Sequence, residues 1–539
     1  MRMKQGLVLS LLCISGFIAY TQPAAVYDQR WRVVDSLVKK KGLTLSALDE
    51  VGKIYGLARR EKNEPQLIKA LVYRIRLELK QSDQGLPAAI RELQRQVDSS
   101  KSEAVRAILE NMLAGLYERF LQLNSWKIAS RTALVQRADT DMATWPVVEL
   151  KAKTRELYLA SLTAEHVLSQ INVAAYQPLI IPGKMPDLRP TLFDLLAHRA
   201  LSYFETGDTY QIKPEHPFVL NDPALYSDAT DFAQHHFVTN DSLSGHFQAV
   251  RLFQRLTRLH LKDTKPEALI SLDIERLGFV TTYSLEEKED VYLQALGRIT
   301  EKYPLSPAAA QAWFLQAQKY YQRASIPGAP EDSTGAIEAR AICERVIAEP
   351  DSSEGKENCI QLIQQILRKE IHLQTEKVNI PNKPFRGLVT WRNVDRLYFR
   401  VIRLSGDSAG TEMRKQRLHD KVLLSQLLAT PVVRSFTQDL PATHDYRLHR
   451  VEIAIGSLPP GAYALFSSSD SSWSTDKGVM GLQYFTVSSI AYIKQGDDYF
   501  VLDRETGKPI AGAVARLVAR LQDRTFSVHK AQAEPKITS

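Results

Sequence analysis

The chain has 539 residues, a formal net charge of +8, and 44% hydrophobic and 24% charged residues. This length exceeds the roughly 250–300 residues over which one hydrophobic core grows, so we expect several domains. The composition excludes a fibrous or disordered chain. The charge excess is mild and forms no basic stripe interleaved with aromatic residues, which argues against a nucleic-acid partner.

The first 21 residues have the pattern of a secretory signal peptide. Arg2 and Lys4 form a charged start, and an apolar run follows from Gly6 to Ala19. This run is shorter than the roughly 20 residues that a transmembrane helix needs. Small residues precede a cleavage position after Thr21. We therefore expect an exported protein, in the periplasm, at the cell surface or extracellular, with no transmembrane segment in the mature chain.

Residues 26–375 have the apolar periodicity of amphipathic helices. Single turns separate these helix-length segments, which predicts stacked helical hairpins of the tetratricopeptide (TPR) type, most regular over residues 292–367. The segment 175–241 does not follow this pattern, because it is rich in proline and also contains tyrosine and histidine. We expect it to be a long excursion between helices that packs on the helical surface.

The pattern changes near Lys377, where prolines and short strand-like runs replace the helix formers. The runs and the turn residues between them predict an antiparallel β-sandwich over residues 377–488, interrupted by a helix-like insert at 412–428. A second β segment begins near residue 490, but only about 50 residues remain where a sandwich needs about 100. We therefore expect residues 489–539 to be an incomplete second β-sandwich module of a truncated chain. The strand-like runs lie at 388–391, 397–404, 451–455, 462–466 and 484–487, and then at 499–502 and 513–518.

No sequence motif of a nucleophilic, zinc-dependent or phosphate-binding active site occurs, so we expect no enzyme, no cofactor and no metal. His235 and His236 are adjacent and could form a metal pair, but neighbours on a helix point about 100° apart, so packing is the favoured interpretation. A group of acidic residues near the C-terminus lacks the glycine and final glutamate of an EF-hand, so an acidic turn is favoured over a calcium site. These residues are Asp497, Asp498, Asp503 and Glu505.

Two cysteines, Cys343 and Cys359, remain after removal of the signal peptide. An even pair in an exported protein predicts a disulfide, and the alternative is two buried thiols on helices. We expect the two residues on neighbouring antiparallel helices that are joined through a turn at 350–355. Zinc is disfavoured, because no paired histidines accompany them.

Several phrases in the β region resemble the first β modules of bacterial alpha-2-macroglobulin family proteins. They are RNV at 392–394, LYFRV at 397–401, LPPGAYAL at 458–465, FTVS at 485–488, and the turn phrase DRETGKPIAGAV at 503–514, which also resembles carboxypeptidase regulatory-like modules. The helical segments 31–61 and 338–374 resemble the helical preamble of some members. The resemblance therefore implies the N-terminal portion of such a protein, with a macroglobulin-like domain at 377–488.

What the resemblance implies for function is endopeptidase inhibition by trapping, with proteases as partners. Many members acylate the trapped protease through a C-x-E-Q thioester, and this motif is missing here, since Val346 and Leu362 stand three residues after Cys343 and Cys359. The chain therefore lacks the thioester and the bait region of the family. The alternative is an exported TPR-like scaffold, whose helical groove binds a peptide or protein and whose β modules are spacers.

Overall fold

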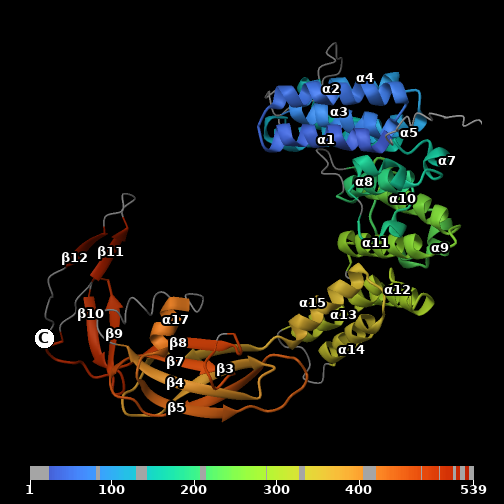
Figure 1. The fold of residues 1–539 in the computed structure, drawn as a ribbon. Coiled ribbons are helices and arrows are strands. Elements are labelled where there is room, and N and C mark those ends of the chain that lie inside the picture. Colours follow the sequence, from blue (N-terminus) through green and yellow to red (C-terminus); the bar gives the residue numbers. More distant parts are fainter. Residues whose placement is uncertain are drawn as a thin grey trace, which may run out of the picture. The chain divides into compact units, whose positions relative to one another are not determined.

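The computed structural model describes residues 23–79, 85–128, 142–181, 183–206, 214–286, 288–326, 334–404, 421–474, 476–496, 498–513, 518–522 and 528–532. The described chain is helical as far as Leu367 and continues mainly as β-strands (Figure 1), which confirms the expected order of a helical region followed by a β region. Within these residues, no helix combines the length and apolarity that a membrane crossing requires. The expected signal peptide, residues 1–21, lies outside them.

Two compact units divide the chain, residues 1–312 and residues 313–539. The first unit is built from α-helices and short 3₁₀ helices, and helix α13 (Ala310–Ser325) begins at its end. Its helices are α1 (Pro23–Lys39), α2 (Thr44–Glu61), α3 (Glu64–Glu78), α4 (Gly85–Ser99), α5 (Glu103–Ile128), η1 (Met142–Thr144), α6 (Val147–Ala160), α7 (Glu165–Leu168), η2 (Val173–Leu179), η3 (Pro186–Leu188), α8 (Leu192–Glu205), η4 (Pro223–Tyr226), α9 (Ala229–Gln234), α10 (Gly245–His260), α11 (Glu267–Tyr283) and α12 (Glu289–Lys302).

Helices α1, α2 and α3 share one hydrophobic core, which includes Tyr27 and Trp31 of α1 and Ile54 of α2. The break between α2 and α3 follows from local chemistry. Lys62 takes the left-handed conformation that ends a helix, and the side chain of Asn63 accepts a hydrogen bond from a backbone N–H in the first turn of α3. The chain therefore reverses within a few residues, and α2 and α3 pack together as a hairpin.

The segment 175–241 differs from the expected surface excursion, because it contains the deeply buried helix α8. The helix begins with a capping box in which the side chains of Thr191 and Asp194 each accept a hydrogen bond from the other's backbone N–H. Most of its side chains are buried, Phe193 and Leu201 among them, and it packs against α5 and α10. Apolar residues around much of its circumference bury the helix on several sides, so α8 is part of the core of the first unit.

The second unit contains helices α14 (Gly335–Ala348) and α15 (Glu354–Leu367), followed by the β region. The expected C-terminal boundary of the helical region, residue 375, is wrong, because residues Glu370–Thr375 form strand β1. In this strand Ile371 and Leu373 alternate with polar residues and pack into the core of the β region. Burial of these two side chains on one face of a sheet favours the strand over a continued helix.

The β region has two sheets whose inner faces share one core. One sheet has the strand order β1-β3-β6, and the other has the order β2-β8-β7-β4-β5. The core receives Val389 and Ile453 from the first sheet and Phe399, Leu465 and Phe485 from the second. The strands after β1 are β2 (Val378–Asn379), β3 (Phe385–Arg392), β4 (Arg396–Leu404), β5 (Val432–Asp439), β6 (His449–Ile455), β7 (Gly461–Ser468) and β8 (Met480–Val487).

Five of these strands coincide with predicted runs, whereas β1, β2 and β5 were not predicted. The expected purely antiparallel arrangement is wrong for one pair, since β2 runs parallel to β8. The physical reason is that the chain crosses from one sheet to the other between β1 and β2, which brings β2 alongside β8 in the same direction. The expected helical insert is present as α17 (Lys421–Leu428), which packs Leu424 and Leu427 on the outer face of the larger sheet, and residues 412–420 lie outside the described chain.

A second β segment follows the two sheets. Strands β9 (Ile490–Gln495) and β10 (Asp498–Asp503) form an antiparallel hairpin, and β11 (Val518–Gln522) pairs with β12 (Val528–Gln532). The predicted strand at 499–502 lies within β10, whereas most of the one predicted at 513–518 lies outside the described residues. After β10, the Asp503 side chain accepts hydrogen bonds from the backbone of Glu505 and from the backbone and hydroxyl of Thr506. Gly507 has a φ of 67° in this turn, a conformation that favours glycine.

Candidate functional site

A groove of about 910 Å³ in the first unit is the candidate binding site. We call it the α3–α8 groove, because α3 and α8 line it together with α5, η2 and the residues that follow η2. Its apolar lining includes Val72 and Ile75 from α3, Met112 and Leu116 from α5, and Leu195 from α8. A groove of this size lined mainly by apolar side chains is typical of sites that bind a ligand or a peptide.

One rim of the α3–α8 groove is held in place by the N-terminal end of α3. The hydroxyl of Tyr176 in η2 donates a hydrogen bond of 3.1 Å to the carboxylate of Glu64. Burial and this neighbouring carboxylate raise the pKa of Tyr176 above its usual range, so the hydroxyl remains a donor. The chain after η2 carries Ile181, which also lines the groove and whose side chain is 95% exposed. A single exposed isoleucine is ordinary on a protein surface, and Ile181 matters here only because it lines the groove, where a bound molecule would contact it.

The charged side chains that line the groove are all basic. The lining contains Lys69 and Arg76 from α3 and Arg199 from α8, and no aspartate or glutamate. Among the described residues, none of these three cations forms an ion pair. The α3–α8 groove therefore combines an apolar surface with three cations and no carboxylate in its lining.

The guanidinium of Arg199 is oriented by a buried side chain. Its Nε donates a hydrogen bond of 2.7 Å to Oδ1 of Asn111, a residue with no solvent exposure. The amide of Asn111 is itself fixed, because Nδ2 donates to the hydroxyl of Ser161 and to the backbone carbonyl of Leu196. With Nε occupied, Nη2 of Arg199 lies beside Gly115, where an added Cβ would be 3.4 Å from it. Arg199 is thus a preorganised donor for an anion.

Lys69 has a different environment. Its ammonium lies 4.5 Å from the centroid of the Trp31 ring, and partial burial lowers the pKa of Lys69. Asp28 and Asp35 of α1 oppose this shift of the pKa without forming an ion pair with Lys69. An anion bound beside Lys69 would offset the cost of its desolvation.

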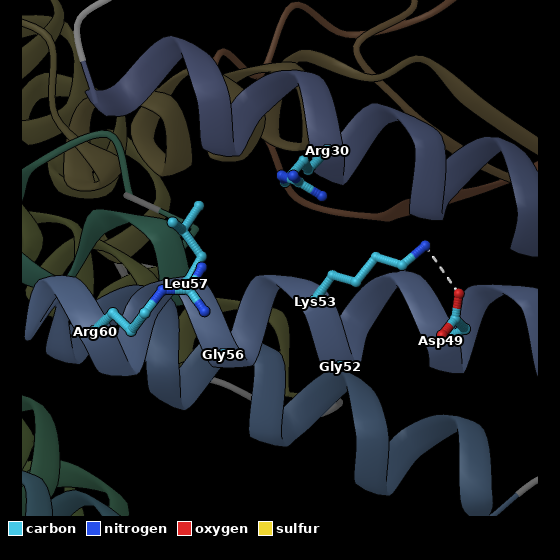
Figure 2. Close-up of a pocket in the computed structure, with 7 residues that line it drawn as sticks. All are labelled: Arg30, Asp49, Gly52, Lys53, Gly56, Leu57 and Arg60. Atoms are coloured by element: carbon cyan, nitrogen blue, oxygen red, sulfur yellow. Dashed lines mark ion pairs between the residues drawn. The ribbon is translucent and has the colours of Figure 1, made fainter.

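A second hollow of about 510 Å³ lies between α1 and α2, and Figure 2 shows its lining. Of its three cations, Arg30, Lys53 and Arg60, the first two form ion pairs. Arg30 binds Glu50 at 2.8 Å, and Lys53 binds Asp49 at 2.9 Å. Because these carboxylates neutralise two of the three basic side chains, we rank this hollow below the α3–α8 groove as an anion site.

A buried cluster of titratable side chains joins α8 to α10. Nε2 of His260 lies 2.9 Å from the fully buried carboxylate of Asp194, and Nδ1 lies 2.7 Å from that of Asp263. Burial alone lowers the pKa of His260, but its hydrogen bonds to the two carboxylates outweigh burial and raise the pKa. Asp194 also accepts hydrogen bonds from Thr191 at the start of α8. With all of these groups engaged within the protein, the cluster holds two helices together.

A second titratable group lies between α8 and α11. Burial raises the pKa of Glu205 to about 7, and the nearby Glu275 carboxylate adds to this rise. Burial also tends to raise the pKa of Glu275, but His198 and Arg189 outweigh it and lower that pKa. One carboxyl oxygen of Glu205 is buried and has no hydrogen-bond partner. Glu205 therefore favours its protonated form at the C-terminal end of α8, where the helix dipole also disfavours a negative charge.

Cys343 and Cys359 are both buried and lie on the adjacent helices α14 and α15, in agreement with the expected placement. The two thiols are free and within hydrogen-bonding contact of each other. The neighbouring sulfur and burial raise the pKa of Cys359 far above its usual range. The expected disulfide stays a prediction.

The other sequence candidates occupy ordinary structural positions. His235 follows the end of α9 and lies 3.0 Å from the carboxylate of Asp222, whereas His236 is exposed. In the acidic group near the C-terminus, Asp503 caps its turn through hydrogen bonds, Glu505 pairs with Lys383, and Asp497 lies outside the described residues. Among the described residues, no group of three or more potential ligands could hold a metal ion.

The α3–α8 groove was not predicted from the sequence. Its walls come from segments far apart in the chain, so local periodicity contains no sign of the groove. One local signal was available for α8, namely Thr191 three residues before Asp194 at the head of an apolar run, which is the pattern of a capping box.

Comparison with protein-family models found no match to this chain, and comparison with curated proteins found none either.

Proposed function

We propose that this chain is the N-terminal part of an exported macroglobulin-type protein that contributes to endopeptidase inhibition through binding and not through catalysis. The observation that carries this proposal is the order of the β region, in which eight strands in two sheets enclose one core and lead directly into a further hairpin. This is the arrangement expected of a β-sandwich followed by the beginning of a second module. The phrases that resemble macroglobulin modules lie largely on these strands and their turns.

The helical hairpins support the same proposal. Pairs such as α2–α3, α4–α5 and α14–α15 pack as neighbours in sequence, which fits a TPR-like preamble. Covalent trapping by the chain itself is excluded from the proposal, because the C-x-E-Q motif is missing from its sequence. Binding surfaces on the helices and on exposed strand edges would then be its contribution to inhibition.

The experiment uses both the mature chain and the native protein. The mature chain, residues 22–539, is incubated with a panel of endoproteases, and we expect neither hydrolysis by the chain nor an adduct that survives boiling. The native protein is recovered from the envelope fraction with an antibody against the first unit. It should exceed 60.9 kDa and reduce cleavage of large protein substrates by a bound protease. A native protein no larger than 60.9 kDa without effect on any protease would contradict the proposal.

The α3–α8 groove favours a second candidate function, that of an exported TPR-like scaffold. In this proposal the groove binds a peptide segment of a partner, and the β modules act as spacers. The two candidates differ in their readouts, because a scaffold binds peptide without changing protease activity on large substrates.

A further inference from the structure

We propose that the α3–α8 groove binds a peptide segment of a partner protein that carries apolar and acidic side chains, with the three cations of its lining, Lys69, Arg76 and Arg199, pairing with its carboxylates. This inference rests on the protein-binding role proposed above and names the chemistry of the partner. The groove is described entirely by residues of the first unit.

The charge of the groove selects an anionic partner. Arg76 is exposed and, like Arg199, has no ion pair among the described residues, while the lining contains no carboxylate. Placing another cation here would add repulsion, whereas a carboxylate would gain charge-assisted hydrogen bonds. Electrostatic complementarity of this kind decides specificity more than it decides total affinity.

The hydrogen bond from Arg199 to the buried Asn111 distinguishes this arginine from a solvated surface arginine. A long exposed side chain normally loses conformational entropy when it pairs with an anion. Here the buried Asn111 already holds Nε of Arg199 at 2.7 Å, with Nη2 beside Gly115 in the lining of the groove. Much of the ordering has therefore occurred before a ligand arrives, which favours binding.

The apolar lining and the spacing of the cations favour a peptide over a small anion. Lys69 and Arg76 are seven residues apart on α3, which corresponds to about 10 Å along the helix axis. An extended peptide covers this distance in about three residues. Aliphatic side chains between two such carboxylates would meet Val72 and Met112, and the exposed Ile181 would close over them.

The test measures binding of a fluorescent heptapeptide, Ala-Asp-Leu-Val-Asp-Leu-Ala, to the full mature chain by fluorescence anisotropy. A second peptide with asparagine in place of both aspartates is the ligand control. The variants are Arg199→Gln and Arg76→Gln, and the protein control is Arg91→Gln, an exposed arginine on α4 that does not line the groove. Circular dichroism verifies that each variant is folded.

We expect the acidic peptide to bind, the asparagine peptide to bind at least tenfold more weakly, and each groove variant to lose about tenfold in affinity. The Arg91→Gln variant should bind like the unaltered chain, and higher salt should weaken binding. Absence of acidic-peptide binding, or binding by Arg199→Gln and Arg76→Gln that is as tight as binding by the unaltered chain, would overturn the inference. Binding to vesicles of phosphatidylglycerol and phosphatidylcholine without peptide binding would also overturn it, in favour of a membrane surface.

Failure of this inference is distinguishable from failure of the proposed function. Inhibition of proteolysis by the native protein does not depend on the peptide probe. If the native protein protects large substrates while the acidic peptide does not bind, only the assignment of the groove is wrong.

Discussion

The replacement of Glu205 by glutamine should make the first unit more stable above neutral pH. Burial raises the pKa of Glu205 from 4.5 to about 7, so the folded protein holds this proton more tightly than the unfolded chain does. A raised carboxyl pKa stabilises the fold below pH 4.5, and this contribution is lost as the pH rises from 4.5 through 7. The glutamine variant does not titrate and should not show this loss.

The magnitude follows from the shift of the pKa. A rise from 4.5 to about 7 corresponds to about 3.4 kcal/mol at about 1.36 kcal/mol per pKa unit. Because the side chain keeps some contact with water, solvent screening reduces this value, and we expect about 2 kcal/mol. At pH 8 the variant should therefore be about 2 kcal/mol more stable than the unaltered chain, while at pH 4.5 the two should agree within a few tenths of a kcal/mol.

Hydrogen exchange measured by mass spectrometry over α8 is the suitable assay, because a chain with two units is not expected to unfold in a single transition. Protection factors, corrected for intrinsic exchange, are compared at pH 4.5 and pH 8. The matched control is Glu301→Gln on α12, an exposed glutamate. His260 also has a raised pKa but is present in both proteins, so its contribution cancels in the difference. Equal protection of α8 at pH 8 in the variant and the unaltered chain would refute the reasoning.

Three further predictions concern the second unit and the packing of helices. Oxidation of the mature protein should join Cys343 to Cys359 and add on the order of 3 kcal/mol, and alkylation of both thiols in non-reducing native protein would argue against the bridge. Gly335→Ala should destabilise the second unit by about 1–3 kcal/mol in denaturant unfolding, because its Cβ would be 2.5 Å from a backbone oxygen of α13. Gly278→Ala has open space around its Cβ and should stabilise α11 by up to about 1 kcal/mol in the same assay. Deletion from residue 489 onward removes the exposed apolar side chains of β9 and β10 and should reduce self-association in light scattering, and equal aggregation of the shortened chain would contradict this.

The local features of the fold were predictable from the sequence, because they depend on neighbours along the chain. The change of apolar period near Lys377 separates helices from strands, with an error of a few residues at β1. The placement of Cys343 and Cys359 on adjacent helices also followed from local helix and turn signals. The missed strand β5 is an edge strand that is mostly exposed, so it lacks the buried alternation by which strands are recognised.

The candidate site was decided by the tertiary structure alone. Arg199 and Asn111 are 88 residues apart in sequence, yet one hydrogen bond between them orients the guanidinium toward the α3–α8 groove. Likewise, the pKa of Glu205 depends on Glu275 of another helix and on burial that only the packed helices create. A sequence pattern specifies which face of each helix is apolar. The pairing of those faces, and therefore the charge and shape of the groove between them, results from the balance of packing over the whole unit.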